Sequence, residues 1–366
     1  MDKNHYCIIM AGGIGSRFWP ASRNSKPKQF LDILGTGKTF IQQTYERFLT
    51  VVPKENILVV TSAQYEALVK EQLPDLLPEN ILLEPYRKNT APCIAYAAYK
   101  LETLNPNASM VVAPSDHLIL NEDEFTATIK SALEYTEQND SLITLGIKPT
   151  RPETAYGYIQ YNKKLGIDIT GSTAYKIKTF TEKPDVDLAK VFIDSGEFLW
   201  NSGIFIWNLR TIKGELERHQ SEIASLFAKG RDIYNTYKES EFIENVYEAC
   251  PSISIDYGIM EKTDKAIVYP ASFGWSDLGT WESLYVQLDK DDQGRNNAVK
   301  AERVMLNEVR DSLIISDEPG KLIVAANLDG YMIVNTEDVL MICPRDEATF
   351  KNIITDLVVK ELSDFQ

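Results

Sequence analysis

The stretch IIMAGGIGSRFWPASRNSKPKQFLDILG, from Ile8 to Gly35, says most about how this chain folds. Its short apolar run stops abruptly at the paired glycines Gly12 and Gly13. A buried strand that ends in a glycine-rich loop is typical of open parallel sheets, whose ligands bind beyond the carboxyl ends of the strands. The loop then carries four cations, Arg17, Arg23, Lys26 and Lys28. We therefore expect the first strand to lead into a loop that binds a small anion.

Apolar runs of the same kind recur along the first half of the chain. Those at 6–10, 57–61, 81–85, 110–117 and 142–147 are predicted to be buried strands, and helical spacing marks 39–50, 63–73, 91–103 and 123–139. Strands that alternate with helices predict an α/β fold with a doubly wound, mostly parallel, Rossmann-like sheet covered on both faces.

The alternation loosens after residue 150. Segments 155–162 and 174–184 look like antiparallel additions to the sheet, and 201–219 turns from a strand into a helix. The polar segment 289–297 has the composition of a linker. Beyond it lie short β-like runs and a closing helix. We therefore expect a catalytic domain over 1–290 and a small C-terminal β-rich domain over 291–366.

Composition excludes several classes of protein. The chain has 366 residues, 44% of them apolar, and a formal net charge of −15. A chain this acidic is a poor candidate for binding nucleic acid or anionic lipid. The start resembles no signal peptide, and no apolar run is long enough for a membrane helix. The four cysteines are widely spaced, which argues against a zinc site or a disulfide framework. We expect a cytoplasmic protein.

The glycine loop suits phosphate binding. Gly12, Gly13 and Gly15 let backbone N–H groups approach a phosphate closely. The dinucleotide fingerprint is absent because Phe18 occupies its third glycine position, and DILGTGKT fails as a Walker A loop because Asp32 replaces the first glycine. Arg17 and Lys28 would supply charge for a polyphosphate. The alternative is a solvated basic loop.

Two acids follow the pattern of metal ligands. Asp116, in APSDH, comes at the end of an apolar strand, and Asp277 lies in GWSDLGTW between glycines and tryptophans. Mg²⁺ is commonly held by one or two carboxylates together with substrate phosphates. The alternative for Asp116 is a helix cap.

Further polar residues sit near predicted strand ends. Glu84 closes one strand, and Thr90 is predicted to cap the helix that follows it. Glu182, Lys183 and Asn201 are suited to sugar hydroxyls and a sugar phosphate. By composition alone, each of these three is more often a surface or turn residue than a ligand-binding one.

A resemblance narrows these alternatives. MAGGIGSRFWPASRNSKPKQF, EPYRKNTAP, PSDH, YGYI, FTEKP, WNSGIFIW, SIDYGIMEKT and GWSDLGTW occur in this order. Over about residues 5–290 the chain closely resembles the mannose-1-phosphate guanylyltransferase family, also called GDP-mannose pyrophosphorylases, which are sugar nucleotidyltransferases. The glycine motif is shared widely among such enzymes, whereas WPxSRxxxPKQF and WNSGxFxW are narrower.

The resemblance implies a reaction and its site. GTP and α-D-mannose 1-phosphate would give GDP-mannose and pyrophosphate, with Mg²⁺ as cofactor, and a homodimer is left open. Arg17 and Lys28 would be catalytic and hold the triphosphate, and Asp116 and Asp277 would hold the metal. Nucleotide binding would involve Gly12, Gly13, Gly15, Glu84, Asn89, Thr90 and Asp116. The sugar phosphate would be bound by Gly157, Glu182, Lys183 and Asn201.

The chain also departs from the family. Lys88 stands where an arginine usually precedes NTAP, which keeps the charge but loses planar bidentate contacts. Some relatives carry a C-terminal cupin domain, for which this chain is too short, so we expect the transferase activity alone. Two other functions stay open: a guanylyltransferase for another sugar 1-phosphate, such as fucose or a heptose, and a non-catalytic regulator that binds GTP or GDP-mannose.

Overall fold

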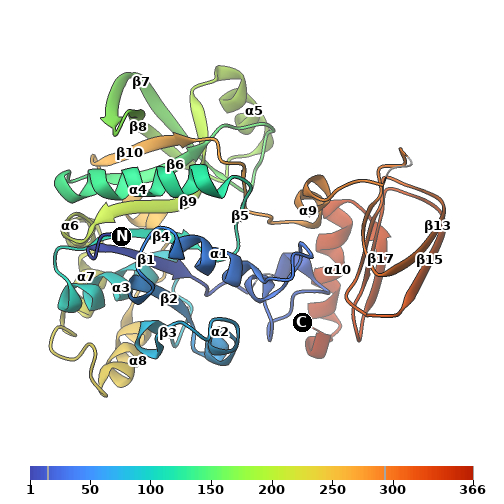
Figure 1. Ribbon diagram of the computed structural model, residues 1–366, viewed down its shortest axis with the longest axis horizontal. Coiled ribbons are helices and arrows are strands. Elements are labelled where there is room, and N and C mark those ends of the chain that lie inside the picture. Colours follow the sequence, from blue (N-terminus) through green and yellow to red (C-terminus); the bar gives the residue numbers. More distant parts are fainter. Residues whose placement is uncertain (15, 292–293, 366) are drawn as a thin grey trace. The chain divides into compact units, whose positions relative to one another are not determined.

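The computed structural model describes residues 1–14, 16–291 and 294–365 (Figure 1). The chain divides into two compact units. The first unit combines Met1–Gly12 with Gln42–Trp275, and the second combines Gly13–Ile41 with Ser276–Gln366. The division at residues 290 and 291 that the sequence suggested stays a prediction about where the catalytic part ends.

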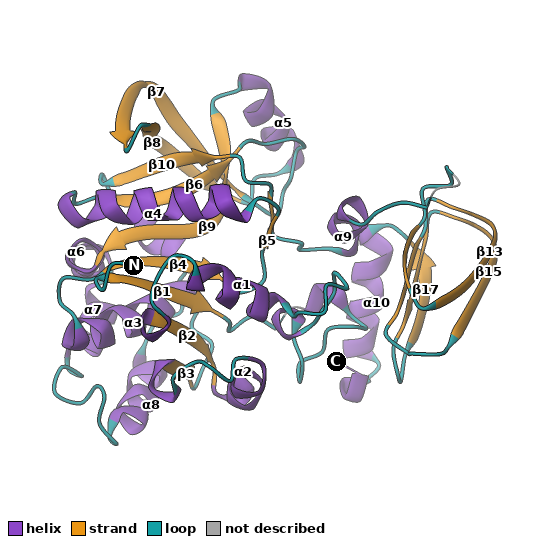
Figure 2. Ribbon diagram, in the orientation of Figure 1, coloured by secondary structure: helices purple, strands orange, loops and turns teal. Residues whose placement is uncertain are grey.

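The first unit is built on a nine-stranded sheet with the order β3-β2-β1-β4-β9-β6-β10-β8-β7 (Figure 2). Strands β1 to β4 run parallel to one another and β10 runs parallel to β6, whereas β9 and β8 run antiparallel to the strands beside them. The mostly parallel α/β sheet is therefore confirmed. The strands are β1 (His5–Met10), β2 (Ile57–Ser62), β3 (Ile81–Glu84), β4 (Ser109–Pro114), β6 (Leu142–Ile147), β7 (Gly157–Ile169), β8 (Ser172–Glu182), β9 (Phe198–Asn208) and β10 (Ala266–Ala271).

The register of the parallel strands gathers their carboxyl ends at one edge. Met10 of β1 lies opposite Val60 of β2 and Pro114 of β4, and Ser62 of β2 lies opposite Glu84 of β3. The residues that follow these strands therefore emerge together, as expected for an open parallel sheet.

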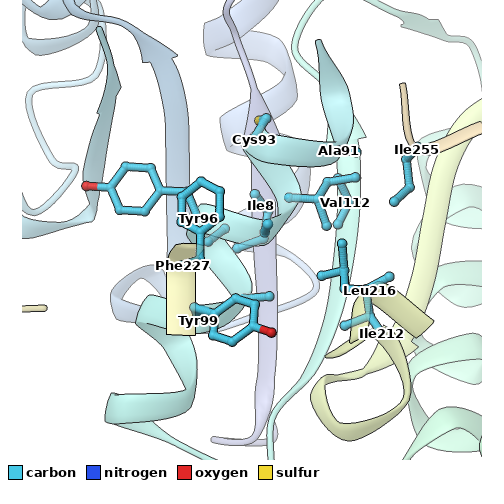
Figure 3. Close-up of a cluster of buried hydrophobic side chains, with 14 of the residues drawn as sticks. Ile8, Ala91, Cys93, Tyr96, Tyr99, Val112, Ile212, Leu216, Phe227 and Ile255 are labelled. Atoms are coloured by element: carbon cyan, nitrogen blue, oxygen red, sulfur yellow. The ribbon is translucent and has the colours of Figure 1, made fainter. Parts of the chain in front are cut away.

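Helices cover the sheet of the first unit and pack on it, or on one another, through their apolar sides. The alanine-rich α3 is buried along most of its length and packs with α6, α7 and α8 against Ile8, Leu58 and Val112 in one apolar core (Figure 3). Helix α4 contacts β9 and β4 through residues outside that core. The helices are α1 (Phe40–Leu49), α2 (Glu66–Gln72), α3 (Thr90–Leu104), α4 (Glu122–Gln138), α5 (Val186–Ser195), α6 (Leu209–His219), α7 (Ser221–Ala228) and α8 (Glu239–Ala249).

The second unit is β-rich, as predicted. Its strands β12, β14 and β16 pair in parallel, β17 closes that sheet antiparallel, and β13 pairs in parallel with β15. A small core of Val309, Ile314, Ala325 and Ile333 lies between them. The elements are α9 (Trp281–Gln287), β12 (Ala298–Lys300), β13 (Arg303–Arg310), β14 (Leu313–Ser316), β15 (Leu322–Asp329), β16 (Tyr331–Asn335), β17 (Leu340–Pro344) and the closing helix α10 (Glu347–Val359).

The predicted linker is packed at its end. Asn297 is buried, and its Nδ2 donates to the Val309 carbonyl at 2.8 Å and to the Asp291 carboxylate at 2.9 Å. Residues 292 and 293 of this segment lie outside the described residues. Within the described ranges, none of the helices has the length and apolar character needed to span a bilayer.

Candidate active site

In the predicted nucleotide site, Gly12 lies against the side chain of Glu84. A Cβ atom at Gly12 would lie 3.0 Å from Oε2 of Glu84, so the absence of a side chain lets the carboxyl pack against the loop. Glu84 is 7% exposed, and Tyr247 donates its hydroxyl hydrogen bond to Oε1 at 2.9 Å. Burial raises the pKa of Glu84 to about 7, and the Tyr247 hydrogen bond opposes part of that rise.

The start of α3 corrects one detail of the sequence prediction. Asn89, rather than Thr90, is the N-cap, and its side-chain oxygen accepts from the Thr90 N–H at 2.9 Å. Asn89 has φ of 71° and ψ of −171°, a conformation that is strained for a residue with a side chain. The Thr90 hydroxyl accepts from the backbone N–H of Ile255 at 2.8 Å, so it ties α3 to the segment before η6 (Asp256–Met260).

Asp116 lies two residues beyond the end of β4, in the first unit. Its side chain is about one-third exposed, and its Oδ1 is 4.0 Å from Nε2 of His117. Trp275 donates from Nε1 to Nδ1 of His117 at 3.1 Å, which assigns the His117 proton to Nε2 when the ring is neutral. The imidazole is thus fixed beside the carboxylate by a tryptophan.

The structure brings the predicted sugar-phosphate residues into one cluster. Gly157 of β7 pairs with Glu182 of β8, and a Cβ atom at Gly157 would lie 2.4 Å from Oε2 of Glu182 and 3.3 Å from Cβ of Asn201. Only glycine leaves room for both side chains. Lys183 is beside them, with Nζ 2.9 Å from Oε1 of Glu182. We call Gly157, Glu182, Lys183 and Asn201 the sugar cluster.

Sequence reasoning assigned no role to Asp256, which lies against this cluster. Asn201 donates from Nδ2 to Oδ1 of Asp256 at 2.9 Å. Burial and the nearby Glu182 carboxylate raise the pKa of Asp256 to about 7, while the Asn201 hydrogen bond and Lys183 act in the opposite direction. The only sequence signal for this residue was its place within SIDYGIMEKT.

Aromatic rings join the two parts of the site in the first unit. Tyr156, next to Gly157, packs edge-on against both Trp200 and Trp275 with ring centroids 5.1 Å apart in each case. Trp275 in turn meets the His117 ring at 5.3 Å. The sugar cluster is therefore connected to the Asp116 and His117 pair through continuous aromatic contacts.

In the second unit, Lys28 is held in a buried position. Its side chain is 3% exposed, and Nζ lies 5.6 Å from the ring centroid of Phe18 and 5.0 Å from that of Phe40. Nζ also donates to the backbone carbonyl of Asp277 at 2.6 Å. A lysine and an acid 249 positions apart in the sequence are thus neighbours.

Asp277 has a carboxylate that suits a hard cation. The Gly279 N–H donates to Oδ1 at 2.9 Å, and a Cβ atom at Gly279 would lie 2.6 Å from Oδ2. Glycine at position 279 therefore leaves room for the carboxylate, which the Gly279 N–H holds in place. Carboxylate oxygens are preferred ligands of Mg²⁺, and the exposed portion of Asp116 offers the same type of donor in the first unit. The donor chemistry fits a divalent metal ion.

The cations of the glycine loop separate into different roles. Arg17 is exposed, on the short turn η1 (Ser16–Phe18). Arg23 instead donates to the carbonyls of Pro20 and Phe365 and to the carboxylate of Asp338. Arg23 therefore stabilises the end of the chain.

Gly13 connects the glycine turn to the segment that carries Lys28. Its carbonyl accepts from Nε2 of Gln29 at 2.8 Å, and Gln29 lies on η2 (Lys28–Phe30) beside Lys28. Gly15, the third predicted phosphate-binding glycine, lies outside the described residues.

One other group in the described part of the chain brings possible metal ligands together. Asp2, His5 and Glu137 place donor atoms within 4.8 Å of one another. His5 is the first residue of β1, so this group lies at the amino edge of the sheet, away from the carboxyl edge where Glu84 and Asp116 are found. We do not assign it to the active site.

Comparison with known proteins points to one family. The model of the family described as Nucleotidyl transferase matches residues 6–294. Mannose-1-phosphate guanylyltransferase RfbM of Salmonella typhimurium is 38% identical over 93% of this chain and 69% of that protein. Xanthan biosynthesis protein XanB of Xanthomonas campestris is also 38% identical, over 93% of this chain and 70% of its own length.

A solved structure agrees in fold. A protein of Thermus thermophilus, described as a mannose-1-phosphate geranyltransferase, has a TM-score of 0.84 and 28% identity, and the match covers 97% of this chain and 99% of that one. The likeness includes the C-terminal β-rich part, because so little of either chain is left out. The chain therefore belongs to the nucleotidyl transferase family, among its mannose-1-phosphate guanylyltransferases.

Proposed function

We propose that this enzyme transfers GMP from GTP to α-D-mannose 1-phosphate, which gives GDP-mannose and pyrophosphate. The observation that carries the proposal is the similarity to guanylyltransferases along 93% of the chain, at 38% identity. Two arrangements of predicted site residues also support the proposal. In the first unit these are Glu84 and the sugar cluster, and in the second unit Lys28 lies beside Asp277.

In the nucleotide site, we propose that the Glu84 carboxylate recognises the guanine base of GTP. Guanine offers its N1–H and 2-amino group together to a carboxylate, and adenine offers no such pair. A site built on these bonds rejects the wrong base because its buried polar group is left unpaired. Glu84 is buried against Gly12, which is the environment such discrimination needs. Gly12, Gly13, Gly15, Asn89 and Thr90 complete the proposed nucleotide site.

On the sugar side, we propose that the sugar cluster holds mannose 1-phosphate. Its carboxylate and amide groups suit the hydroxyl groups of a sugar, because hydroxyls both donate and accept hydrogen bonds. A phosphate dianion would be repelled by Glu182 and favours Lys183, whose ammonium is 2.9 Å from that carboxylate. The cluster thus distinguishes the two ends of a sugar phosphate.

The reaction needs charge stabilisation more than proton transfer. An oxygen of the sugar phosphate attacks the α-phosphorus of GTP in line, a new P–O bond forms, and the bond to the bridging oxygen of pyrophosphate breaks. Both reactants are anions. We propose that Arg17 and Lys28 offset their repulsion and stabilise the charge that develops on pyrophosphate. Lys28 is almost fully removed from water, which strengthens its interaction with an anion.

Nucleotidyl transferases use divalent metal ions, and we propose Mg²⁺ here with Asp116 and Asp277 as its protein ligands. The ion would neutralise phosphate charge and orient the leaving group. The Lys28 bond to the Asp277 carbonyl keeps a cation next to one of these acids. In this position, Lys28 would neutralise part of the phosphate charge, and the metal ion would neutralise the rest.

A pyrophosphate-release assay with a panel of substrates tests the proposal. GTP, Mg²⁺ and mannose 1-phosphate should give turnover well above that seen with ATP, UTP or CTP, or with fucose 1-phosphate or a heptose 1-phosphate. Preference for another sugar phosphate would support the first alternative function. Binding of GTP without any release of pyrophosphate would support a regulator. We propose that the enzyme works in the cytoplasm without nucleic acid or membrane partners, and a homodimer stays a prediction.

A further inference from the structure

Asp256 is the first residue of η6 and touches the sugar cluster from the side of the α3 core. Ile255, its neighbour, is buried in that core (Figure 3). Its backbone N–H donates a hydrogen bond to the Thr90 hydroxyl. The backbone that carries Asp256 is therefore fixed by packing and by a hydrogen bond. A side chain on such a support has a defined position.

Hydrogen bonds determine the orientation of the Asn201 amide. Its Oδ1 accepts from the hydroxyl of Thr144 at 2.9 Å and from the backbone N–H of Gly203 at 3.2 Å. Its Nδ2 donates to Asp256 at 2.9 Å. The Gly203 N–H can only donate and the Asp256 carboxylate accepts, so the reversed amide would lose these two bonds, whereas the Thr144 hydroxyl could still accept from it. An amide nitrogen has two hydrogens, and Asp256 uses one of them.

We propose that Asp256 is a positioning residue for sugar recognition, which holds the Asn201 amide so that its second N–H faces a hydroxyl of the bound sugar. This inference rests on the proposed function. Gly157 is part of the same arrangement, because any side chain there would collide with Glu182 and crowd Asn201.

Packing alone does not explain why a buried acid occupies position 256. Asp256 lies within electrostatic reach of the Glu182 carboxylate, and the two acids repel each other. Lys183 pairs directly with Glu182 at 2.9 Å, so the cluster has more acids than cations close to it. A polar group buried only to fill space is often replaced by an apolar one at no cost. The unfavourable charge is therefore best understood as serving recognition.

The test compares substitutions that keep or remove the hydrogen-bond acceptor. Asp256→Asn retains a carbonyl oxygen of the same reach, whereas Asp256→Leu keeps the branched shape in a larger side chain and has no acceptor. We expect Asp256→Leu to raise the KM for mannose 1-phosphate about tenfold, the scale of one lost hydrogen bond that leaves a buried donor unpaired. Asp256→Asn should stay within about threefold of wild type. The KM for GTP should change little in both variants.

A double-mutant cycle separates positioning from a structural effect. If Asp256 acts through Asn201, Asp256→Leu should add nothing to the defect of Asn201→Ala. Additive defects would overturn the proposal, and so would a KM for GTP that rises as much as the KM for the sugar phosphate. Tyr257→Phe is the matched control, since Tyr257 is the next residue and its side chain is exposed.

A second variant covers the case in which Asp256→Leu fails to fold. Asp256→Ala removes the acceptor with less steric change and should show the same selective rise in KM. Wild-type turnover with mannose 1-phosphate is measured first, and its absence would reject the proposed function. Normal wild-type turnover together with a normal KM in the folded acceptor-free variant would reject only the role of Asp256.

Discussion

Substitution of Glu84 by glutamine should change how stability depends on pH. The variant keeps an oxygen that accepts from the Tyr247 hydroxyl and removes a carboxyl that must be ionised at high pH. Burial raises the Glu84 pKa from 4.5 to about 7. A carboxyl with a raised pKa binds its proton more tightly in the folded protein, so wild-type stability falls as the pH rises from about 4.5 to about 7 and then levels off.

The size of the effect follows from the same shift. A shift of about 2.5 pKa units at 1.36 kcal/mol each gives a penalty of about 3 kcal/mol above pH 7, and most of it develops between pH 5 and pH 8. Relative to wild type, Glu84→Gln should therefore gain about 2–3 kcal/mol in free energy of unfolding between those pH values.

Urea unfolding at pH 5, 6, 7 and 8, followed by circular dichroism, measures this difference. The exposed Glu79 lies on the segment before β3, and Glu79→Gln is the matched control, for which we expect no comparable trend. In the assay of function, Glu84→Gln should also narrow the preference for GTP over ATP. A pH-independent difference between Glu84→Gln and wild type would refute the argument that burial governs this carboxyl.

Three further predictions concern the chemical step. Lys28→Met, which keeps most of the side-chain volume but no charge, should lower kcat about a hundredfold in pyrophosphate release without a large loss of thermal stability, and near-normal turnover would remove Lys28 from the mechanism. Asp277→Asn should raise the Mg²⁺ concentration for half-maximal activity about tenfold or more, and an unchanged Mg²⁺ titration would show that Asp277 is no ligand. The rate at saturating Mg²⁺ should fall below about pH 6.5 as the sugar phosphate protonates, and His117→Asn should keep that profile, whereas a shift of this acid-side fall by a full pH unit in the variant would show that His117 acts as a base.

The parallel part of the sheet could be predicted because most of its strands are buried on both faces, although β3 is only half buried. The runs that form β1, β2, β3, β4 and β6 are short, apolar and bounded by turns, which is the usual signal of a buried parallel strand. Strand β10 (Ala266–Ala271) was not anticipated. Its position between β6 and β8 is set by pairing with segments more than 80 residues away, and the local sequence pattern carries no such information.

The parallel strand pairing of the second unit was also not predicted from the sequence. Residues 303–310 of β13 pair in register with 322–329 of β15, a fixed offset along the chain. Glu308 and Asn327 occupy nearly equivalent positions, and both have positive φ, at 51° and 56°. The repeat consists of backbone conformation and of matched burial at the pairs Leu306–Ala325 and Val309–Leu328 more than of residue identity, so it is hard to detect in a single sequence.

Some residues of the candidate site could likewise be placed from the sequence, and others could not. The glycine loop, Glu84 and Asp116 could be placed because they directly follow strands of a parallel sheet. The contact between Lys28 and Asp277 joins segments 249 positions apart, and spacing alone gives no hint of it. Asp256 was missed because its importance lies in the Asn201 amide that it holds, a contact that only the folded chain creates.

Phosphorus NMR of the complete reaction tests the central claim most directly. Equimolar GTP and α-D-mannose 1-phosphate with Mg²⁺ should lose their signals together, while GDP-mannose and pyrophosphate appear in a one-to-one ratio. The Lys28→Met variant should show the same products at a much lower rate. Release of inorganic phosphate in place of pyrophosphate, or consumption of GTP while mannose 1-phosphate is left unchanged, would contradict the assignment of this chain as a guanylyltransferase for mannose 1-phosphate.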